Sequence, residues 1–166
     1  AEVDVSTGEM TGEVIVRLTN EVPDDVPSYV AGRSEGLANE VILSIHSPHR
    51  VDRLLIDGEV ADVERQVEYG LERWLTPVVL PRGETVEVRF ELSGGVRLRD
   101  GSYDLFLHHQ PMVQPQETTV ALTFAGARID AVESRSPMDG VGAENATTRV
   151  MLVEDQAISI ELTRVS

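Results

Sequence analysis

The sequence of 166 residues contains no cysteine and no lysine. Without cysteine the chain has no disulfide framework, zinc ribbon, iron–sulfur cluster or thiol nucleophile. Without lysine it lacks the residue that a Schiff base or a phosphate-binding loop requires. It also has neither the Gly-x-Ser-x-Gly motif of a serine nucleophile nor a dinucleotide fingerprint after an expected strand. We therefore predict a non-catalytic protein that binds no cofactor.

Aromatic residues are also scarce, with three Phe, three Tyr and the single Trp74. The core must therefore consist mainly of Val, Leu and Ile, a bias that favours sheet over helix. No apolar run approaches the roughly 18–20 residues that a membrane-spanning helix needs. The chain opens on Ala1, Glu2 and Asp4 rather than on a basic and apolar leader. We expect a domain cut from a longer protein.

The charges that are present are strongly one-sided. Asp and Glu number 29, Arg supplies all 14 basic side chains, and the formal net charge is −15. Nucleic acids and anionic membranes bind clustered basic side chains that displace their counterions. Neither is predicted as a partner, and the isolated domain is not expected to insert into a membrane. Because Arg forms planar forks with carboxylates, we expect most Arg side chains to pair with acids at the surface.

Apolar and polar residues alternate with a period of two along almost the whole chain. Such alternation is typical of strands with one packed and one solvated face. In the segment 102–109, for example, Tyr103 and Leu105 fall on one face, while Phe106 and His108 fall on the other. The clearest strands are expected at 11–20, 39–46, 84–92, 102–109, 118–124 and 157–165.

Turn signals separate the alternating segments. They are Asp57-Gly58, 81–83, 93–95 and Asp100-Gly101, and Gly in such turns tolerates a positive φ. Together with the alternation they predict an all-β fold: a two-sheet antiparallel β-sandwich of immunoglobulin-like type, with about nine strands. We expect residues 1–166 to form a single domain. The least regular stretch, 60–75, has room for a turn of helix, which Gly70 and Pro77 would keep short.

The four histidines are the side chains best suited to bind zinc in a chain without cysteine. They occur as His46-x-x-His49 and as His108-His109. Two such pairs would suit zinc if their strands were neighbours. Because adjacent residues of a strand point to opposite faces, at most one of His108 and His109 could join a given site. His46 and His49 are therefore weak candidates for a metal site, and the same residues also fit polar strand ends. Carboxylates are too numerous for the sequence to single out a catalytic pair.

Two proline-bearing stretches suggest an interaction rim. One lies at 26–30 and includes Tyr29, and the other lies at 110–115 and begins with Gln110 and Pro111. Because Pro cannot donate into a sheet, both also fit stiff connections at strand ends. The candidate rim comprises Tyr29, Trp74, Gln110 and Pro111. If the partner were a glycan, Trp74, Tyr69 and Tyr29 would be the aromatic residues available to stack on a sugar face.

An ordered set of short motifs resembles a known family. The motifs are Leu18-Thr19-Asn20, Pro27-Ser28-Tyr29-Val30, Leu43-Ser44-Ile45-His46-Ser47-Pro48, Asp57-Gly58, Pro81-Arg82-Gly83-Glu84-Thr85, Tyr103, and Gln110-Pro111 with Pro115. From about residue 11 to about residue 124 the chain is similar to the C-terminal β-rich region of an uncharacterised actinobacterial family, domain of unknown function four-zero-one-two. The resemblance implies a parent protein anchored by one transmembrane helix, with its large region outside the membrane. Where the family has an aromatic residue this chain has His46, which argues against a family metal ligand there.

Three functional hypotheses follow from the sequence. The first is a non-catalytic extracytoplasmic module of a cell-envelope protein, located at the cell surface, which binds or supports a protein or a cell-wall glycan. The second is a carbohydrate-binding module. The third is a metal-dependent enzyme domain that uses His46 and His49 with a carboxylate.

Overall fold

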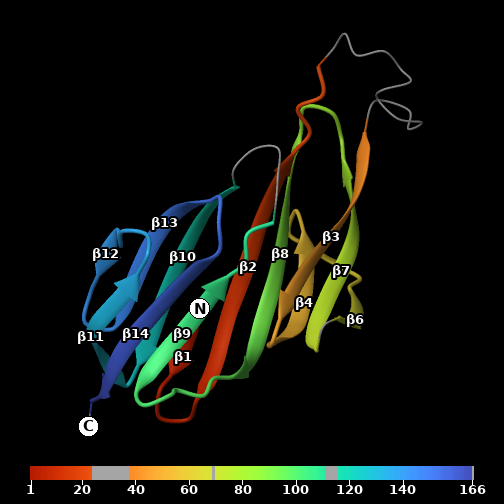
Figure 1. Cartoon of the computed structure of the whole chain (residues 1–166). Helices are drawn as coiled ribbons and strands as arrows, with labels where there is room; N and C mark the ends of the chain where they lie inside the picture. The colour runs from red at the N-terminus through yellow and green to blue at the C-terminus, as the bar shows by residue number, and fades with distance from the viewer. Residues whose placement is uncertain (24–37, 69, 111–115, 166) are drawn as a thin grey trace. The chain divides into compact units, whose positions relative to one another are not determined.

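The structure is a computed structural model that describes residues 1–23, 38–68, 70–110 and 116–165. These residues form fourteen strands and no helix, which confirms the prediction of an all-β protein (Figure 1). The expected number of about nine strands is too low, because strands as short as β5 (Glu59–Ala61) and β12 (Gly140–Val141) leave no alternation to detect. The described part of the chain includes no helix long and apolar enough to cross a membrane.

The chain divides into two compact units. The central unit is Gly12–Gly94, and the terminal unit combines Ala1–Thr11 with Gly95–Ser166. Each unit contains its own cluster of buried apolar side chains. Alternation along a strand shows that one face is buried, but it does not show which other strands cover that face.

The terminal unit contains two sheets. One has the order β12, β13 (Asn145–Leu152), β10 (Gln116–Ala125), β1 (Glu2–Asp4) and the start of β2 (Glu9–Thr19). The other has the order β11 (Ala127–Ser134), β14 (Gln156–Arg164) and β9 (Ser102–Leu107). β1 pairs in parallel with β10, and the other pairs of this unit are antiparallel.

Side chains from both sheets of the terminal unit share one core. Val3 and Phe124 come from the first sheet, and Tyr103 and Ile160 come from the second. The rings of Tyr103 and Phe124 meet edge to face, with 5.3 Å between their centroids. Tyr103, a motif residue of the sequence, is therefore a packing residue, and burial raises the pKa of its hydroxyl.

The central unit also contains two sheets. One has the order β2, β8 (Thr85–Gly95), β4 (Arg50–Ile56) and β5. The other has the order β3 (Asn39–Ser47), β7 (Leu71–Leu80) and β6 (Glu64–Glu68). Their inner faces share a second core, in which Leu54, Val78, Val88 and Phe90 are at most 1% exposed.

Two of the predicted turns have the conformation that their sequence requires. Asp57 and Gly58 have φ of 49° and 84°, and Asp100 and Gly101 have φ of 51° and 85°. Two successive positive φ values define the tight hairpin turn that Asp-Gly favours. The predicted turn at 93–95 is wrong, because these residues belong to β8. A Cβ atom on Gly94 would lie 2.8 Å from Nδ1 of His49. The glycine is therefore explained by the close packing of the His49 ring and not by a turn.

The stretch 60–75 contains no turn of helix where the structure describes it. It contains the end of β5, then β6, and then the start of β7. Gly70, with a φ of 79°, lies between β6 and β7. Pro77 lies within β7, but the register with β6 covers only Leu71–Leu75. The proline therefore lies where β6 no longer needs a hydrogen-bond donor from β7, a position that a sheet tolerates.

Candidate functional site

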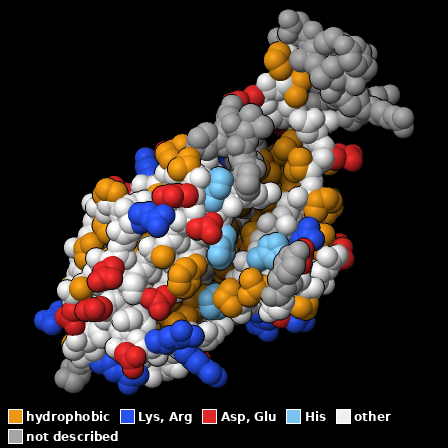
Figure 2. Space-filling model, in the orientation of Figure 1, with side chains coloured by type: hydrophobic (Ala, Val, Ile, Leu, Met, Phe, Trp, Pro, Cys, Tyr) orange, Lys and Arg blue, Asp and Glu red, His pale blue; other side chains and the backbone are white. Residues whose placement is uncertain are grey.

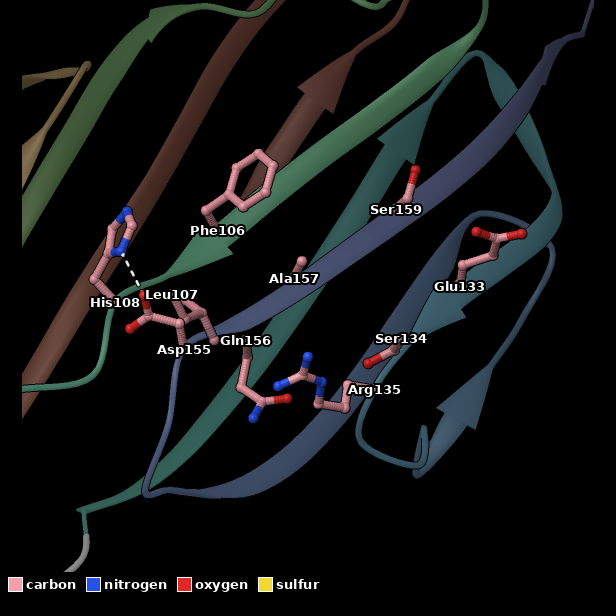
Figure 3. Close-up of a pocket in the computed structure, with 10 residues that line it drawn as sticks. All are labelled: Phe106, Leu107, His108, Glu133, Ser134, Arg135, Asp155, Gln156, Ala157 and Ser159. Atoms are coloured by element: carbon pink, nitrogen blue, oxygen red, sulfur yellow. Dashed lines mark hydrogen bonds and ion pairs between the residues drawn. The ribbon is translucent and has the colours of Figure 1, made fainter.

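The outer face of the sheet β11–β14–β9 carries a shallow groove of about 420 Å³. β14 is the middle strand and supplies the floor, where Ala157 and Ser159 point outward (Figure 3). Register places Phe106 of β9 opposite Ala157, and it places Glu133 of β11 opposite Ser159. Small side chains on the central strand, flanked by larger ones on both neighbours, therefore create the hollow.

One wall of the groove is an aromatic ring. Phe106 is 65% exposed, which is unusual for a large apolar side chain. Its neighbours along β9, Leu105 and Leu107, are only partly exposed. The alternation in the sequence placed Phe106 on the outward face, as observed. It did not reveal that small residues lie beside the ring, because that depends on the pairing with β14.

One end of the groove is closed by a histidine and a carboxylate. Nδ1 of His108 lies 3.3 Å from Asp155, and the backbone N–H of His109 donates to the same carboxylate at 2.8 Å. These two bonds hold the pKa of Asp155 below its ordinary value, and the bond from the backbone of His109 has the larger effect. Asp155 therefore stays ionised at neutral pH and accepts hydrogen bonds.

Polar groups line the opposite side and the floor. Arg135 forms an ion pair with Glu154 at 3.2 Å. The hydroxyl of Ser159 donates to Asp104 at 2.7 Å. Glu133 is exposed and has no hydrogen bond or ion pair with any residue that the structure describes. The groove thus combines one aromatic surface with fixed polar groups and one available carboxylate.

Gln156 lies at the base of the groove and is 6% exposed. Its Oε1 accepts a hydrogen bond from the hydroxyl of Ser136 at 3.0 Å. Within the described ranges no group accepts a hydrogen bond from its Nε2. Gln156 alternates with the outward-facing Ala157 and Ser159, so its side chain lies on the inner side of the sheet, as that of Ile158 does.

The histidines that the sequence suggested as metal ligands have different surroundings. Nε2 of His46 lies 3.3 Å from Glu68, which also pairs with Arg73 at 3.2 Å. The ring of His49 instead packs against Gly94, and burial lowers its pKa. Across the described ranges, no three His, Asp or Glu side chains come together in a way that would hold a metal ion.

The candidate rim is only partly described. Tyr29 and Pro111 lie outside the described residues, as does Tyr69, and Gln110 is exposed at the end of a described segment. Trp74 is not an exposed rim residue, because its side chain is 7% exposed and belongs to the core of the central unit. The guanidinium of Arg65 lies 5.8 Å from the ring centroid of Trp74. Trp74 faces inward from β7 and offers no ring face to a partner.

Several motif residues meet around one buried asparagine. Asn20 is 2% exposed, and its Nδ2 donates to the carbonyl of Leu80 at 2.9 Å. Its backbone N–H donates to the carbonyl of Glu84, and its own carbonyl accepts from the N–H of Gly83. The motifs at 18–20 and 81–85 therefore form one structural junction at the end of β2.

A second hollow, of about 440 Å³, lies over β3 and β7. Its lining is mainly apolar and includes Ile42 and Val79, which are 62% and 55% exposed. Glu40 is its only charged residue among the described ones. It lacks the combination of aromatic and polar groups that distinguishes the groove along β14.

Comparison of the chain with models of known protein families finds no match, and comparison with curated proteins finds none either.

Proposed function

We propose that the protein is a non-catalytic, extracytoplasmic binding module of a membrane-anchored envelope protein, and that the groove along β14 holds its partner. The observation that carries this proposal is the 65% exposure of Phe106 beside a floor of small side chains. A large exposed apolar side chain in a concave, partly polar setting is a common feature of binding sites. The family resemblance supports the cell-surface location.

An immunoglobulin-like β-sandwich is the architecture that we propose for this module. It is supported by the two sheets of each unit, whose inner faces contribute to one buried cluster. Binding surfaces of such folds lie on exposed sheet faces and connecting loops. The groove along β14 is a surface of this kind.

The electrostatics of the carboxylates favour binding over catalysis. A general acid needs a carboxyl group whose pKa is raised by burial or by a like charge. Where the described carboxyl groups show a shifted pKa, the shift is downward, and in the groove this applies to Asp155. Such groups remain ionised near neutral pH and serve as hydrogen-bond acceptors.

Co-sedimentation with insoluble cell walls purified from an actinobacterium tests this proposal. The wild-type protein is expected to sediment with the walls, and Phe106→Ala is expected to remain in the supernatant. Met151→Ala is the matched control, because Met151 is 51% exposed on β13 of the other sheet. The proposal is wrong if the wild type does not sediment, or if the protein releases soluble sugar from the walls.

A further inference from the structure

The exposed ring of Phe106 favours a ligand with a flat apolar face. The ring carries partial negative charge on its faces, which attracts C–H groups with partial positive charge. A sugar ring presents such C–H groups on one face and hydroxyl groups around its edge. The hollow beside Phe106, of about 420 Å³ and open to solvent along β14, has room for a short chain of such rings.

The polar groups of the groove match the hydroxyl edge of a sugar. Asp155, Glu133 and the hydroxyl of Ser159 accept hydrogen bonds, and the guanidinium of Arg135 has N–H groups to donate. Ser159 lies on β14, the middle strand of its sheet, and Asp155 immediately precedes that strand. Bonds that already hold Asp155 and Ser159 in place reduce the entropy that is lost when a ligand binds.

The charges around the groove exclude an anionic ligand. Glu133 and Asp155 line the groove, and Asp104 and Glu154 bond to its lining residues Ser159 and Arg135. Among the described lining residues, Arg135 supplies the only guanidinium, and it is already paired with Glu154. An added anion would meet like charges here, and the net charge of the chain is −15.

A basic peptide is less well matched than an uncharged sugar. Arg135 neutralises Glu154, whereas Asp104 and Asp155 accept bonds from the uncharged donors Ser159 and His109 and keep their negative charge. A basic peptide would find counter-charges here, but ion pairs with exposed carboxylates contribute little to affinity. The exposed ring of Phe106 is therefore the feature that selects the ligand, and a sugar face matches it without needing a counter-charge.

We infer that the groove along β14 binds a short, uncharged oligosaccharide, with one sugar ring stacked on Phe106 and its hydroxyl groups bound by Ser159, Arg135 and the flanking carboxylates. This inference rests on the proposed function and specifies its ligand class. The occupied site extends along β14 from Asp155 to Ser159.

NMR titration of the wild-type protein tests the inference. The probes are the uncharged trisaccharides cellotriose, mannotriose and maltotriose, with the anionic trigalacturonate and the basic peptide trilysine as comparisons. At least one uncharged trisaccharide is expected to shift the amide signals of Phe106, Ala157 and Ser159. Phe106→Ala is expected to weaken this binding by about tenfold or more. Met151→Ala is expected to leave it unchanged.

Ala157→Leu provides a second variant, because the larger side chain fills the floor while the ring of Phe106 stays in place. It is expected to abolish the shifts. The inference is overturned if trigalacturonate or trilysine binds more tightly than every uncharged sugar, or if the shifts map outside the groove. If no uncharged sugar binds while Phe106 is still required for co-sedimentation with cell walls, the ligand class is wrong and the proposed function stands. If co-sedimentation also fails, the proposed function is wrong.

Discussion

At the scale of single residues, the most informative position is Asn20. Its side chain and backbone join the end of β2 to Leu80, Gly83 and Glu84, and its Oδ1 accepts from the N–H of Val22 at 3.2 Å. A buried side chain with several hydrogen bonds is costly to remove, because its partners lose their bonds without gaining water. The asparagine in the Leu18-Thr19-Asn20 motif is therefore explained by stability.

Asn20→Ala is expected to lower the free energy of unfolding by about 1–3 kcal/mol, because the carbonyl of Leu80 loses a buried donor. Urea denaturation at neutral pH measures the change. Thr19→Ala is the matched control, since the exposed hydroxyl of Thr19 bonds only to Thr85 in the described structure. The control is expected to stay within about 0.5 kcal/mol of the wild type. Equal effects of the two changes would contradict this account of Asn20.

His49 is expected to make stability depend on pH. Burial lowers its pKa below the ordinary value of 6.5, so the unfolded chain binds this proton more readily than the folded chain does. The free energy of unfolding should therefore fall as the pH decreases through about 6.5 towards the folded pKa.

Urea midpoints at about pH 7.5 and pH 5.5 measure this effect of His49. The difference between the two midpoints is expected to be smaller in His49→Gln than in the wild type. His108→Gln is the control, because His108 lies at the exposed end of the groove. If His49→Gln retains the full difference between the midpoints, another group is responsible.

At the scale of elements, the hairpin of β4 and β5 depends on its two-residue turn. Gly58 has a φ of 84°, and a Cβ atom there would meet nothing within 4 Å. Gly58→Ala therefore introduces backbone strain without a clash, and we expect it to cost about 1–2 kcal/mol. Thermal unfolding measures this cost.

Gly140→Ala is the matched control for the hairpin, because Gly140 also has open space around it and no positive φ. It is expected to be neutral or slightly stabilising, since Ala restricts the unfolded chain. If Gly58→Ala is as well tolerated as the control, the turn does not determine the stability of this hairpin.

Sequence patterns predicted six of the strands well. β2, β3, β8, β9, β10 and β14 lie close to their expected bounds, because each has one buried and one solvated face. β7 was not predicted, because Gly70 and Pro77 are residues that usually interrupt a strand. Local composition cannot show that the partner β6 ends before Pro77.

The candidate groove was harder to predict than the strands. The alternation placed Phe106 outward, but the groove also depends on Ala157 and Ser159, which are about 50 positions away in the sequence and are aligned by register. Conversely, Trp74 was a candidate binding residue because it is the only tryptophan of the sequence, yet it lies in the core. Residue type alone did not distinguish a packing aromatic from an exposed one.

At the scale of the whole molecule, the excess of acidic side chains should reduce stability. Described ion pairs such as Arg17–Glu87 and Arg53–Glu91 are largely exposed, and pairs of this kind contribute little. The 29 acids outnumber the 14 arginines by 29 − 14 = 15. Figure 2 shows acidic and basic side chains interspersed on the face in view. Mutual repulsion among the surplus acids should outweigh the pairs.

Added salt is therefore expected to stabilise the protein. Raising NaCl from about 0.02 to about 0.5 M screens the repulsion between exposed charges and should raise the urea midpoint at pH 7. The same series near the isoelectric pH of 4.5 is the control, since the net charge there is close to zero. A midpoint that falls with salt at pH 7 would show that the ion pairs outweigh the repulsion.

The parallel pair of β1 and β10 has a consequence for the order in which the chain acquires its structure. During synthesis residues emerge in sequence, but Glu2, Val3 and Asp4 find their β10 partners only at positions 123–125. The central unit lies wholly between these segments, so its own partners are complete first. Val3, which is 1% exposed in the finished fold, must therefore stay uncovered by β10 while more than 100 further residues appear. β1 therefore completes its pairing late, and until then the apolar side chain of Val3 is open to chaperones and to aggregation.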